Sequence, residues 1–411
     1  MSTSLSLSRV FSAVLAAPLL LVSAHAQSFD DLEARLRAHP ALQSLEWQTK
    51  AIGADGLAAL GLPDPVISLG INNLPVEDPA FDRFLPTNKA IGVRQDIPNL
   101  KARRAGAAMS DGQATRLRLL ADQRLAALRA HLITALADRQ RIAEQTQVLK
   151  SQAVAFAALT ETVQTDLAAG RAVAFRLAQI DVERVELDRR QAGLAAEMAA
   201  VEATLIDLVG DVPQTDLPPI APRKWGGEAN AFHAVRLADA GIDIAEAGTM
   251  RAEAAYRPNW GVGVTYQQRE AGSGLPGETF RGDDWFSAQI SFTVPLWKRN
   301  NQDPKLRAAK AREAGARSDL AATARTAQAA WQRLDAARIA AEDSVRLLDV
   351  KVAGLDEQAR AARSNYEAGY GAYSAVIDAE LAALELRSQL AAERARVIAL
   401  TAEANSLLVT S

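Results

Sequence analysis

The sequence of 411 residues contains no cysteine and only four histidines. Disulfide bonds are therefore excluded, and so is a lipid attached through an amino-terminal cysteine. His39, His131 and His233 stand far apart in the sequence. Ligand spacing typical of a metal site is absent, so we predict no metal site and no cofactor.

Aromatic residues make up only 5% of the sequence, and the net charge of −3 comes from interspersed acids and bases. No basic stripe favours a nucleic-acid partner. Gly261-x-Gly263 precedes no helical pattern and is not a nucleotide-binding motif. No carboxylate, histidine or serine arrangement indicates catalysis, so we expect a protein that is not an enzyme.

Long hydrophobic runs are also missing, apart from Val10 to Val22 near the start. Arg9 precedes this run and Ala24-His25-Ala26 follows it, a pattern that predicts a signal peptide over residues 1–26. No later stretch reaches the roughly 18 to 20 apolar residues of a membrane-spanning helix. Insertion into a membrane would therefore require strands closed into a barrel.

Proline is absent between Pro98 and Pro213 and again after Pro304, which predicts long helices in both stretches. In the first stretch, apolar residues recur every seven positions, as in a supercoiled helix. These residues are Leu128, Ala135, Ile142, Leu149, Phe156 and Val163.

Four shorter segments alternate between apolar and polar residues, which predicts strands with one apolar face. They cover about residues 65–73, 89–97, 258–267 and 285–295. If the apolar faces meet lipid, the small and polar faces line a water-filled interior. Trp260 and Tyr266 are then predicted to mark the two membrane interfaces.

The two halves of the sequence repeat one order of elements, which is helix, two strands, long helix, turn and return helix. "LAAGRAVAFRLAQIDVERVEL" from Leu167 corresponds to "YEAGYGAYSAVIDAELAALEL" from Tyr366. We predict a first repeat over 27–210, a linker over 211–231 and a second repeat over 232–411. Sharp turns are expected near Gly170 and Gly369, where glycine permits the left-handed end of a helix.

Four strands are too few to close a membrane barrel, because the smallest bacterial barrels use eight. An open strand edge in lipid would leave backbone groups unpaired. We therefore expect several copies to share one barrel. Three copies would give about 12 strands, although physics alone does not fix that number.

The duplicated elements and the two glycine turns resemble the TolC family of outer-membrane efflux ducts over nearly the whole mature chain. "LPDPVISLGINNLP" around Pro63 to Pro75 and "VRQDIP" from Val93 resemble the heavy-metal branch of that family, the CusC- and CzcC-like ducts. The resemblance implies a mainly α fold with a small β part. Long antiparallel coiled-coil helices form an α-barrel, and four strands per chain contribute to a shared β-barrel of a homotrimer.

The resemblance further implies a location in the Gram-negative outer membrane, with the helices extending into the periplasm. Its partners would be outer-membrane lipid, a periplasmic adaptor protein and an inner-membrane pump of the RND type. The cargo would be heavy-metal cations. A TolC-like duct for drugs or for type I protein secretion, and a periplasmic coiled-coil scaffold, remain alternatives.

Individual positions also follow from the resemblance. Tyr366 corresponds to a tyrosine that helps latch the closed pore entrance, and Asp378 to an acidic residue whose three copies narrow it. Ala375 and Gly371 stand where the family prototype has a second acid and a latch arginine. The resemblance also assigns adaptor docking to the turn residues, which are Gly170, Arg171, Gly369, Tyr370 and Gly371. Independently of the family, copies of Asp378 around a narrow pore would repel one another and attract cations.

Overall fold

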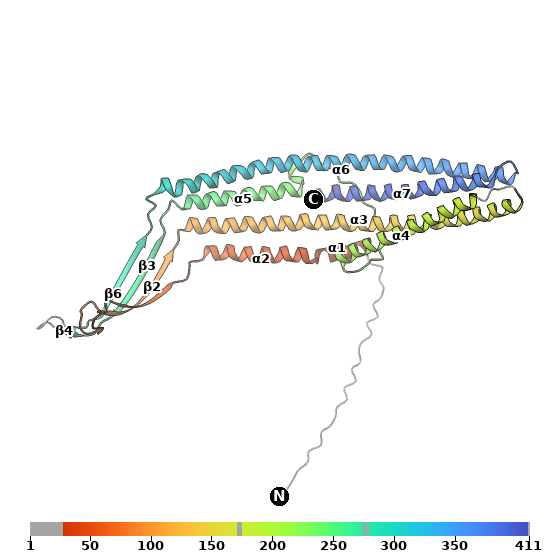
Figure 1. Cartoon of the computed structure of the whole chain (residues 1–411). Coiled ribbons are helices and arrows are strands. Elements are labelled where there is room, and N and C mark those ends of the chain that lie inside the picture. Colours follow the sequence, from red (N-terminus) through yellow and green to blue (C-terminus); the bar gives the residue numbers. More distant parts are fainter. Residues whose placement is uncertain (1–27, 171–174, 274–276, 278, 410–411) are drawn as a thin grey trace, which may run out of the picture.

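The computed structural model describes residues 28–170, 175–273, 277 and 279–409. Two helices dominate it: α3, Leu100–Ala168, and α6, Gln302–Glu367, with 69 and 66 residues. At 1.5 Å per residue, each is about 100 Å long. Both run the full length of the helical part, and a small sheet lies beyond one end (Figure 1). The prediction of a mainly α fold with a small β part is confirmed.

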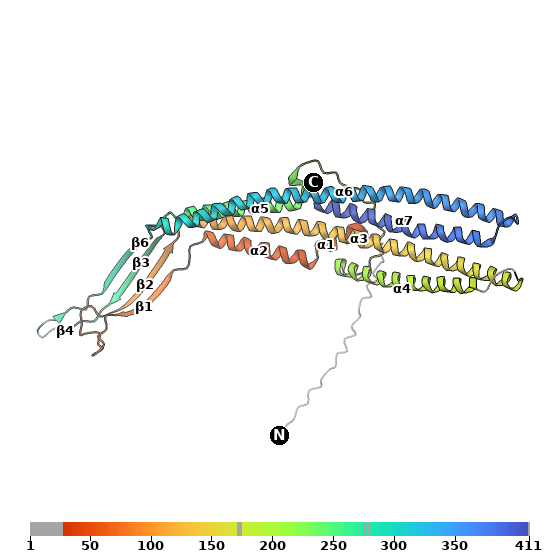
Figure 2. The same cartoon turned by 45° about the horizontal axis from the view of Figure 1, so that its top comes forward.

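The shorter helices lie alongside these two, in two pairs arranged end to end (Figures 1 and 2). Between α3 and α6, α5 packs in the half near the sheet and α7 in the far half. On the other side of α3, α2 occupies the near half and α4 the far half. The bounds are α1 Phe29–Arg37, α2 Pro40–Leu60, α4 Phe175–Val209, α5 His233–Ala254 and α7 Tyr373–Leu407, with 3-10 turns at Ala229–Ala231 and Lys298–Asn300.

The main hydrophobic core lies halfway along the helical part, where the short helices end. Leucines of α1, α3 and the last turns of α4 pack together there, and Leu32, Leu132 and Leu205 are completely buried. Beside this core, α7 ends against the start of α5: the Val409 backbone N–H donates to the Ala231 carbonyl at 2.8 Å. Packing therefore holds the helix ends at the middle of the molecule.

The passage from helix to strand is fixed by two asparagines. Asn99 caps α3, because its side-chain oxygen accepts from the backbone N–H of Ala102 at 2.9 Å. The backbone N–H and the side-chain amide of Asn99 both donate to Oδ1 of Asn259, each at 2.9 Å. Asn259 directly precedes a strand of the other half, so the joints of the two halves are tied to each other.

The sheet contains four antiparallel strands in the order β1-β2-β3-β6. They are β1 Val66–Asn72, β2 Asn88–Ile97, β3 Trp260–Gln268 and β6 Trp285–Phe292. A small hairpin of β4, Gly272–Ser273, and β5, Thr279–Phe280, extends the loop between β3 and β6. The sequence pattern did not predict this hairpin, because two-residue strands are too short to show periodicity.

The order of helix, strand pair, long helix and return helix occurs twice in the chain. Residues 211–228 contain neither helix nor strand. The predicted boundaries of the two repeats and of the linker stay predictions, and the predicted signal peptide, 1–26, lies outside the described residues. Within the part of the chain that the structure describes, no helix combines the length and apolar character needed to cross a membrane.

Candidate functional site

One face of the sheet is mainly apolar, with Lys89 and Gln95 as polar residues toward its two ends. The pairing register aligns Ile67, Val93 and Val264 in one row across the strands. Leu69, Ile91, Tyr266 and Phe286 form a neighbouring row, and Val262 pairs with Ile290. These side chains are exposed or half-exposed, and Leu69 and Phe286 are 79% and 72% accessible. An exposed apolar face of this extent indicates contact with lipid or protein, because water alone would not favour it.

Aromatic side chains mark both ends of the apolar face. Trp260 packs against Phe292 with ring centroids 5.5 Å apart. At the other end Tyr266 pairs with Phe286, and its hydroxyl donates to the carboxylate of Asp284. Six residues separate the two positions along β3, which corresponds to about 20 Å. The structure thus places Trp260 and Tyr266 at opposite ends of one face; their role at membrane interfaces stays a prediction.

The opposite face of the sheet carries small and polar side chains. Ser68, Gly92, Thr265 and Ser287 form one row on it. A Cβ atom on Gly92 would lie 2.6 Å from Ser68 Oγ and 3.2 Å from Thr265 Oγ1. Only glycine fits between these hydroxyls without a shift, so this face is crowded by short polar groups.

Both outer strands of the sheet have an open edge within the described residues. β1 pairs only with β2, and β6 pairs only with β3. The free backbone groups of each edge are ready to pair with another strand.

The helical hairpins end in glycine turns at the far end of the molecule. Gly170 and Gly369 have φ of +71° and +80°, the left-handed conformation that glycine adopts most readily. Tyr370 is 89% exposed beside Gly371, and Phe175 at the start of α4 is 60% exposed. The turns therefore present apolar side chains to the surroundings, whereas Arg171 lies outside the described residues.

Tyr366 and Asp378 lie close to this end but do not share one cavity. Tyr366 is the penultimate residue of α6, just before the α6–α7 turn, and is 44% exposed. Asp378, one turn into α7, is exposed and lines a cavity of about 520 Å³ between α3, α4 and α7. Glu183, Glu186 and Glu385 line the same cavity.

Sequence reasoning did not identify these three glutamates. They belong to helices that are separated by about 200 positions, and their helical spacing alone is that of an ordinary solvated face. Arg189 and Arg190 donate hydrogen bonds to Glu186 and lower the pKa of its carboxyl to about 2. Arg190 also forms an ion pair with Glu385 at 2.9 Å, which links α4 to α7. Four carboxylates, those of Asp378 and the three glutamates, and one guanidinium group, that of Arg190, line the cavity, so its net charge is negative at neutral pH.

A ladder of three ion pairs joins α6 to α7 above the turn. Its distances between nitrogen and oxygen are 2.9, 2.7 and 2.5 Å. Successive pairs are seven residues apart on each helix, the repeat of an antiparallel coiled coil. The pairs are Asp349–Arg394, Asp356–Arg387 and Arg363–Glu380.

Replacing Arg387 with glutamate should destabilise this hairpin by about 1 kcal/mol, because the new carboxylate would face Asp356 and exposed pairs contribute little more. Combining it with Asp356→Arg should restore the midpoint of urea unfolding. Arg333→Glu serves as the control, since Arg333 is an exposed residue of α6 that forms no side-chain bond with any described residue. Equal losses in Arg387→Glu and Arg333→Glu would contradict a role for the ladder.

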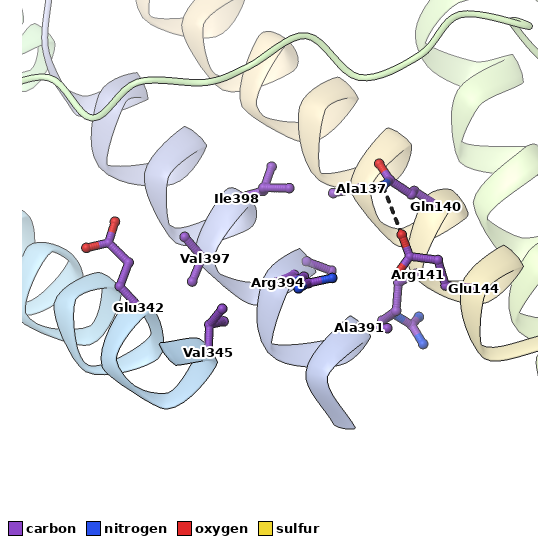
Figure 3. A pocket seen from close by; sticks show the side chains of 11 residues that line it. Ala137, Gln140, Arg141, Glu144, Glu342, Val345, Ala391, Arg394, Val397 and Ile398 are labelled. Atoms are coloured by element: carbon purple, nitrogen blue, oxygen red, sulfur yellow. Dashed lines mark hydrogen bonds between the residues drawn. The ribbon is translucent and has the colours of Figure 1, made fainter. Parts of the chain in front are cut away.

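A second cavity, of about 380 Å³, lies between α3, α6 and α7 (Figure 3). Its two arginines are both paired: Arg141 with Asp138 and Glu197, and Arg394 with Asp349. The charges of this cavity are therefore compensated within the chain. Among the described residues, no group of three or more histidines, cysteines or carboxylates is arranged to hold a metal ion.

Comparison with solved structures identifies the fold. The chain is 14% identical to VceC, an outer membrane protein of Vibrio cholerae; the match covers 93% of this chain and 96% of VceC, with a TM-score of 0.73. For CusC, described in terms of transmembrane channel formation, the identity is 14%, the coverage 92% and 91%, and the TM-score 0.74.

The open state of the MtrE outer membrane channel of Neisseria gonorrhoeae is 16% identical, with coverage of 92% and 88% and a TM-score of 0.68. The chain therefore has the fold of these outer-membrane channels. A scan against models of protein families found no match, and neither did a comparison with curated proteins.

Proposed function

We propose that the protein is the outer-membrane duct of a tripartite efflux system, through which substrates leave the cell passively. The observation that carries this proposal is the sheet: one face is apolar, the other small and polar, and both edges are open. This sheet continues into the helices α3 and α6, each about 100 Å long, which reach far from any membrane that the sheet enters.

Several copies of the chain are needed for the sheet to work in lipid. Its edges would otherwise leave backbone groups without partners. The span of about 20 Å between Trp260 and Tyr266 along the strand would correspond to about 15 Å of membrane depth at a tilt of about 40°, which fits within the roughly 25 Å apolar band of outer-membrane barrels. A homotrimer would combine 12 strands from three sets of four, and with no cysteine in the chain the barrel alone would anchor it.

The helices also carry apolar side chains that no described element of the same chain covers. Val182 and Val185 on α4, and Leu347 and Val350 on α6, are each 59% to 68% exposed. These residues lie at coiled-coil spacing, so neighbouring copies would cover them and close the helices into a tube. The glycine turns would then point together at the far end, where a periplasmic adaptor and an inner-membrane pump of the RND type would dock.

Heavy-metal cations are the cargo that we propose. The support consists of the heavy-metal-type motifs around Pro63 to Pro75 and Val93 to Pro98, and the negative cavity around Asp378. The fold comparison favours no one cargo, because VceC and CusC match with nearly equal TM-scores. Drugs or secreted proteins are therefore the second candidate class.

Deletion of the gene tests both the proposed duct and its proposed cargo. Sensitivity to metals, dyes and antibiotics is measured in the deletion strain and after complementation. Increased sensitivity to metals alone is expected; increased sensitivity to dyes or antibiotics alone would overturn the metal cargo but not the duct. Release of the protein from membranes by a carbonate wash would overturn the duct and favour a periplasmic scaffold.

Replacing Asp378 with asparagine should weaken cation preference in single-channel recordings. If the copies of Asp378 lie about 8 Å from the axis of a shared pore, each contributes about 0.5 kcal/mol in water and three contribute about 1.5 kcal/mol, or roughly tenfold in local cation concentration at low salt. Asp319→Asn is the control, because Asp319 is an exposed residue on α6 far from the turn. Unchanged selectivity in Asp378→Asn would mean that Asp378 does not line the pore entrance.

A further inference from the structure

A third cavity, of about 480 Å³, lies at the middle of the molecule. Its walls come from α1, α3, the first turn of α5, residues 219–223 and the end of α7. Six ionisable side chains other than histidine line it, which are Arg37, Arg129, Arg223, Arg236, Glu33 and Asp122. Among the described residues, four guanidinium groups thus face two carboxylates, which leaves two positive charges uncompensated.

The ion pairs within the cavity do not compensate this excess of positive charge. Glu33 forms ion pairs with two arginines, with Arg129 Nε at 2.5 Å and with Arg37 at 3.9 Å. Arg236 donates from Nε to the backbone carbonyl of Asn230 at 3.0 Å, which neutralises no charge. The guanidinium group of Arg223 has no hydrogen-bond or ion-pair partner among the described residues.

Arg223 is held in place by its backbone and is partly buried. Its backbone N–H donates to Oδ1 of Asn405 at 2.8 Å. Burial lowers the pKa of Arg223, and the positive charge of Arg129 lowers it further. The two guanidinium groups therefore repel each other, and Glu33 forms an ion pair with Arg129 but not with Arg223.

His233 adds a buried donor to the same cavity. Its side chain is only 5% exposed, and no described residue is hydrogen-bonded to its ring. Burial lowers the pKa of His233, so the ring is neutral at pH 7 and one of its nitrogens carries a proton to donate. His233 also opens α5, a helix of 22 residues without a side-chain cap, whose positive end favours an anion.

The paired cavity of Figure 3 provides a comparison within the same molecule. There each arginine has a carboxylate partner, whereas here Arg223, Arg236 and the buried His233 have none among the described residues. The guanidinium group of Arg223 and the ring of His233 are therefore available to bind a ligand that enters the cavity.

We propose that this cavity is a binding site for a doubly charged oxyanion of the phosphate type, either free or as a phosphate ester. Two negative charges match the two uncompensated positive charges. Arg223 and Arg129 would bind the oxyanion through charge-assisted hydrogen bonds, and His233 would donate a third. The apolar side chains of Leu125, Ile133 and Ile220 form the remaining wall, against which the organic part of an ester would fit. This site is independent of the proposed passage through the duct.

Isothermal titration of the full-length detergent-solubilised protein with inorganic phosphate, in chloride buffer of matched ionic strength, tests the site. Saturable binding is expected in the unmodified protein, and Arg223→Gln should weaken it at least about tenfold, the value of one charge-assisted hydrogen bond. Lys224→Gln is the matched control: it removes the same charge from the next residue, which is exposed and has no side-chain partner among the described residues. A second titration with glycerol phosphate in place of inorganic phosphate shows whether the site binds a phosphate ester more tightly than the free ion.

Thermal unfolding distinguishes ligand binding from a structural role of Arg223. Without phosphate, Arg223→Gln should leave the midpoint unchanged or raise it, because the repulsion from Arg129 is lost. With phosphate, only proteins that keep Arg223 should gain stability. Absence of saturable binding to the unmodified protein, or equal weakening in Arg223→Gln and Lys224→Gln, would overturn the proposal.

Discussion

Replacing Ala288 with arginine is expected to prevent assembly of the protein in the outer membrane. Ala288 pairs with Val264, which pairs with Val93, so it belongs to the row midway between the aromatic ends of the apolar face. An arginine on the lipid face at the centre of a bilayer costs about 2 to 4 kcal/mol. Three copies would raise this to about 6 to 12 kcal/mol per trimer, comparable to the whole stability of many proteins.

The neighbouring Gln289 provides a control that differs only in the face of the sheet. Both side chains are exposed in the single chain, so neither substitution has a steric conflict there. Gln289→Arg should assemble normally, because its side chain would lie on the polar face beside Gly263. The measurement is the fraction of protein that resists carbonate extraction from outer membranes. Equal fractions for the two variants would mean that the apolar face does not meet lipid.

The strands and their faces could be predicted from the sequence because alternation has a period of two. Once Ile67, Leu69 and Ile71 lie on one face, the pleat fixes which residues lie on the other. The register then had little freedom, since a shift of one residue would mix the faces. Proline helped to locate the ends of the strands, because Pro98 and Pro258 stand at joints between strands and helices.

The two glycine turns could also be predicted from the sequence, because a left-handed glycine at the end of a helix has a local cause. Gly170 and Gly369 adopt positive φ as predicted from their positions. The cargo, the partners and the number of copies have no such local cause and remain proposals.

Contacts between distant helices could not be predicted in the same way. A heptad pattern indicates which side of a helix is buried but not which helix covers it. Arg190 and Glu385 are separated by 195 residues, yet their side chains meet at 2.9 Å. The central cavity is a stronger case, since Arg129, Arg223 and His233 converge there from three segments whose patterns are unremarkable alone.

Replacing Tyr370 with glutamate is expected to abolish efflux while leaving the protein intact in the membrane. The side chain of Tyr370 is 89% exposed at the turn between α6 and α7, so its loss removes almost no packing within the chain. Exposed aromatic residues that become buried in an interface commonly contribute 2 kcal/mol or more to binding. A charge at this position would weaken docking of the adaptor about 30-fold or more.

Val76→Glu is the appropriate control for this effect. Val76 is 96% exposed, but it lies in the loop between β1 and β2, at the opposite end of the molecule from Tyr370. Both variants introduce one carboxylate at a freely exposed position, so a general effect of charge or expression would change both alike. Loss of the resistance identified in the deletion strain by Tyr370→Glu alone, at equal protein levels in the outer membrane, would assign docking to the turn. Full resistance in Tyr370→Glu would mean that the α6–α7 turn is not part of the adaptor interface, because a buried carboxylate without a partner is too costly to be tolerated there.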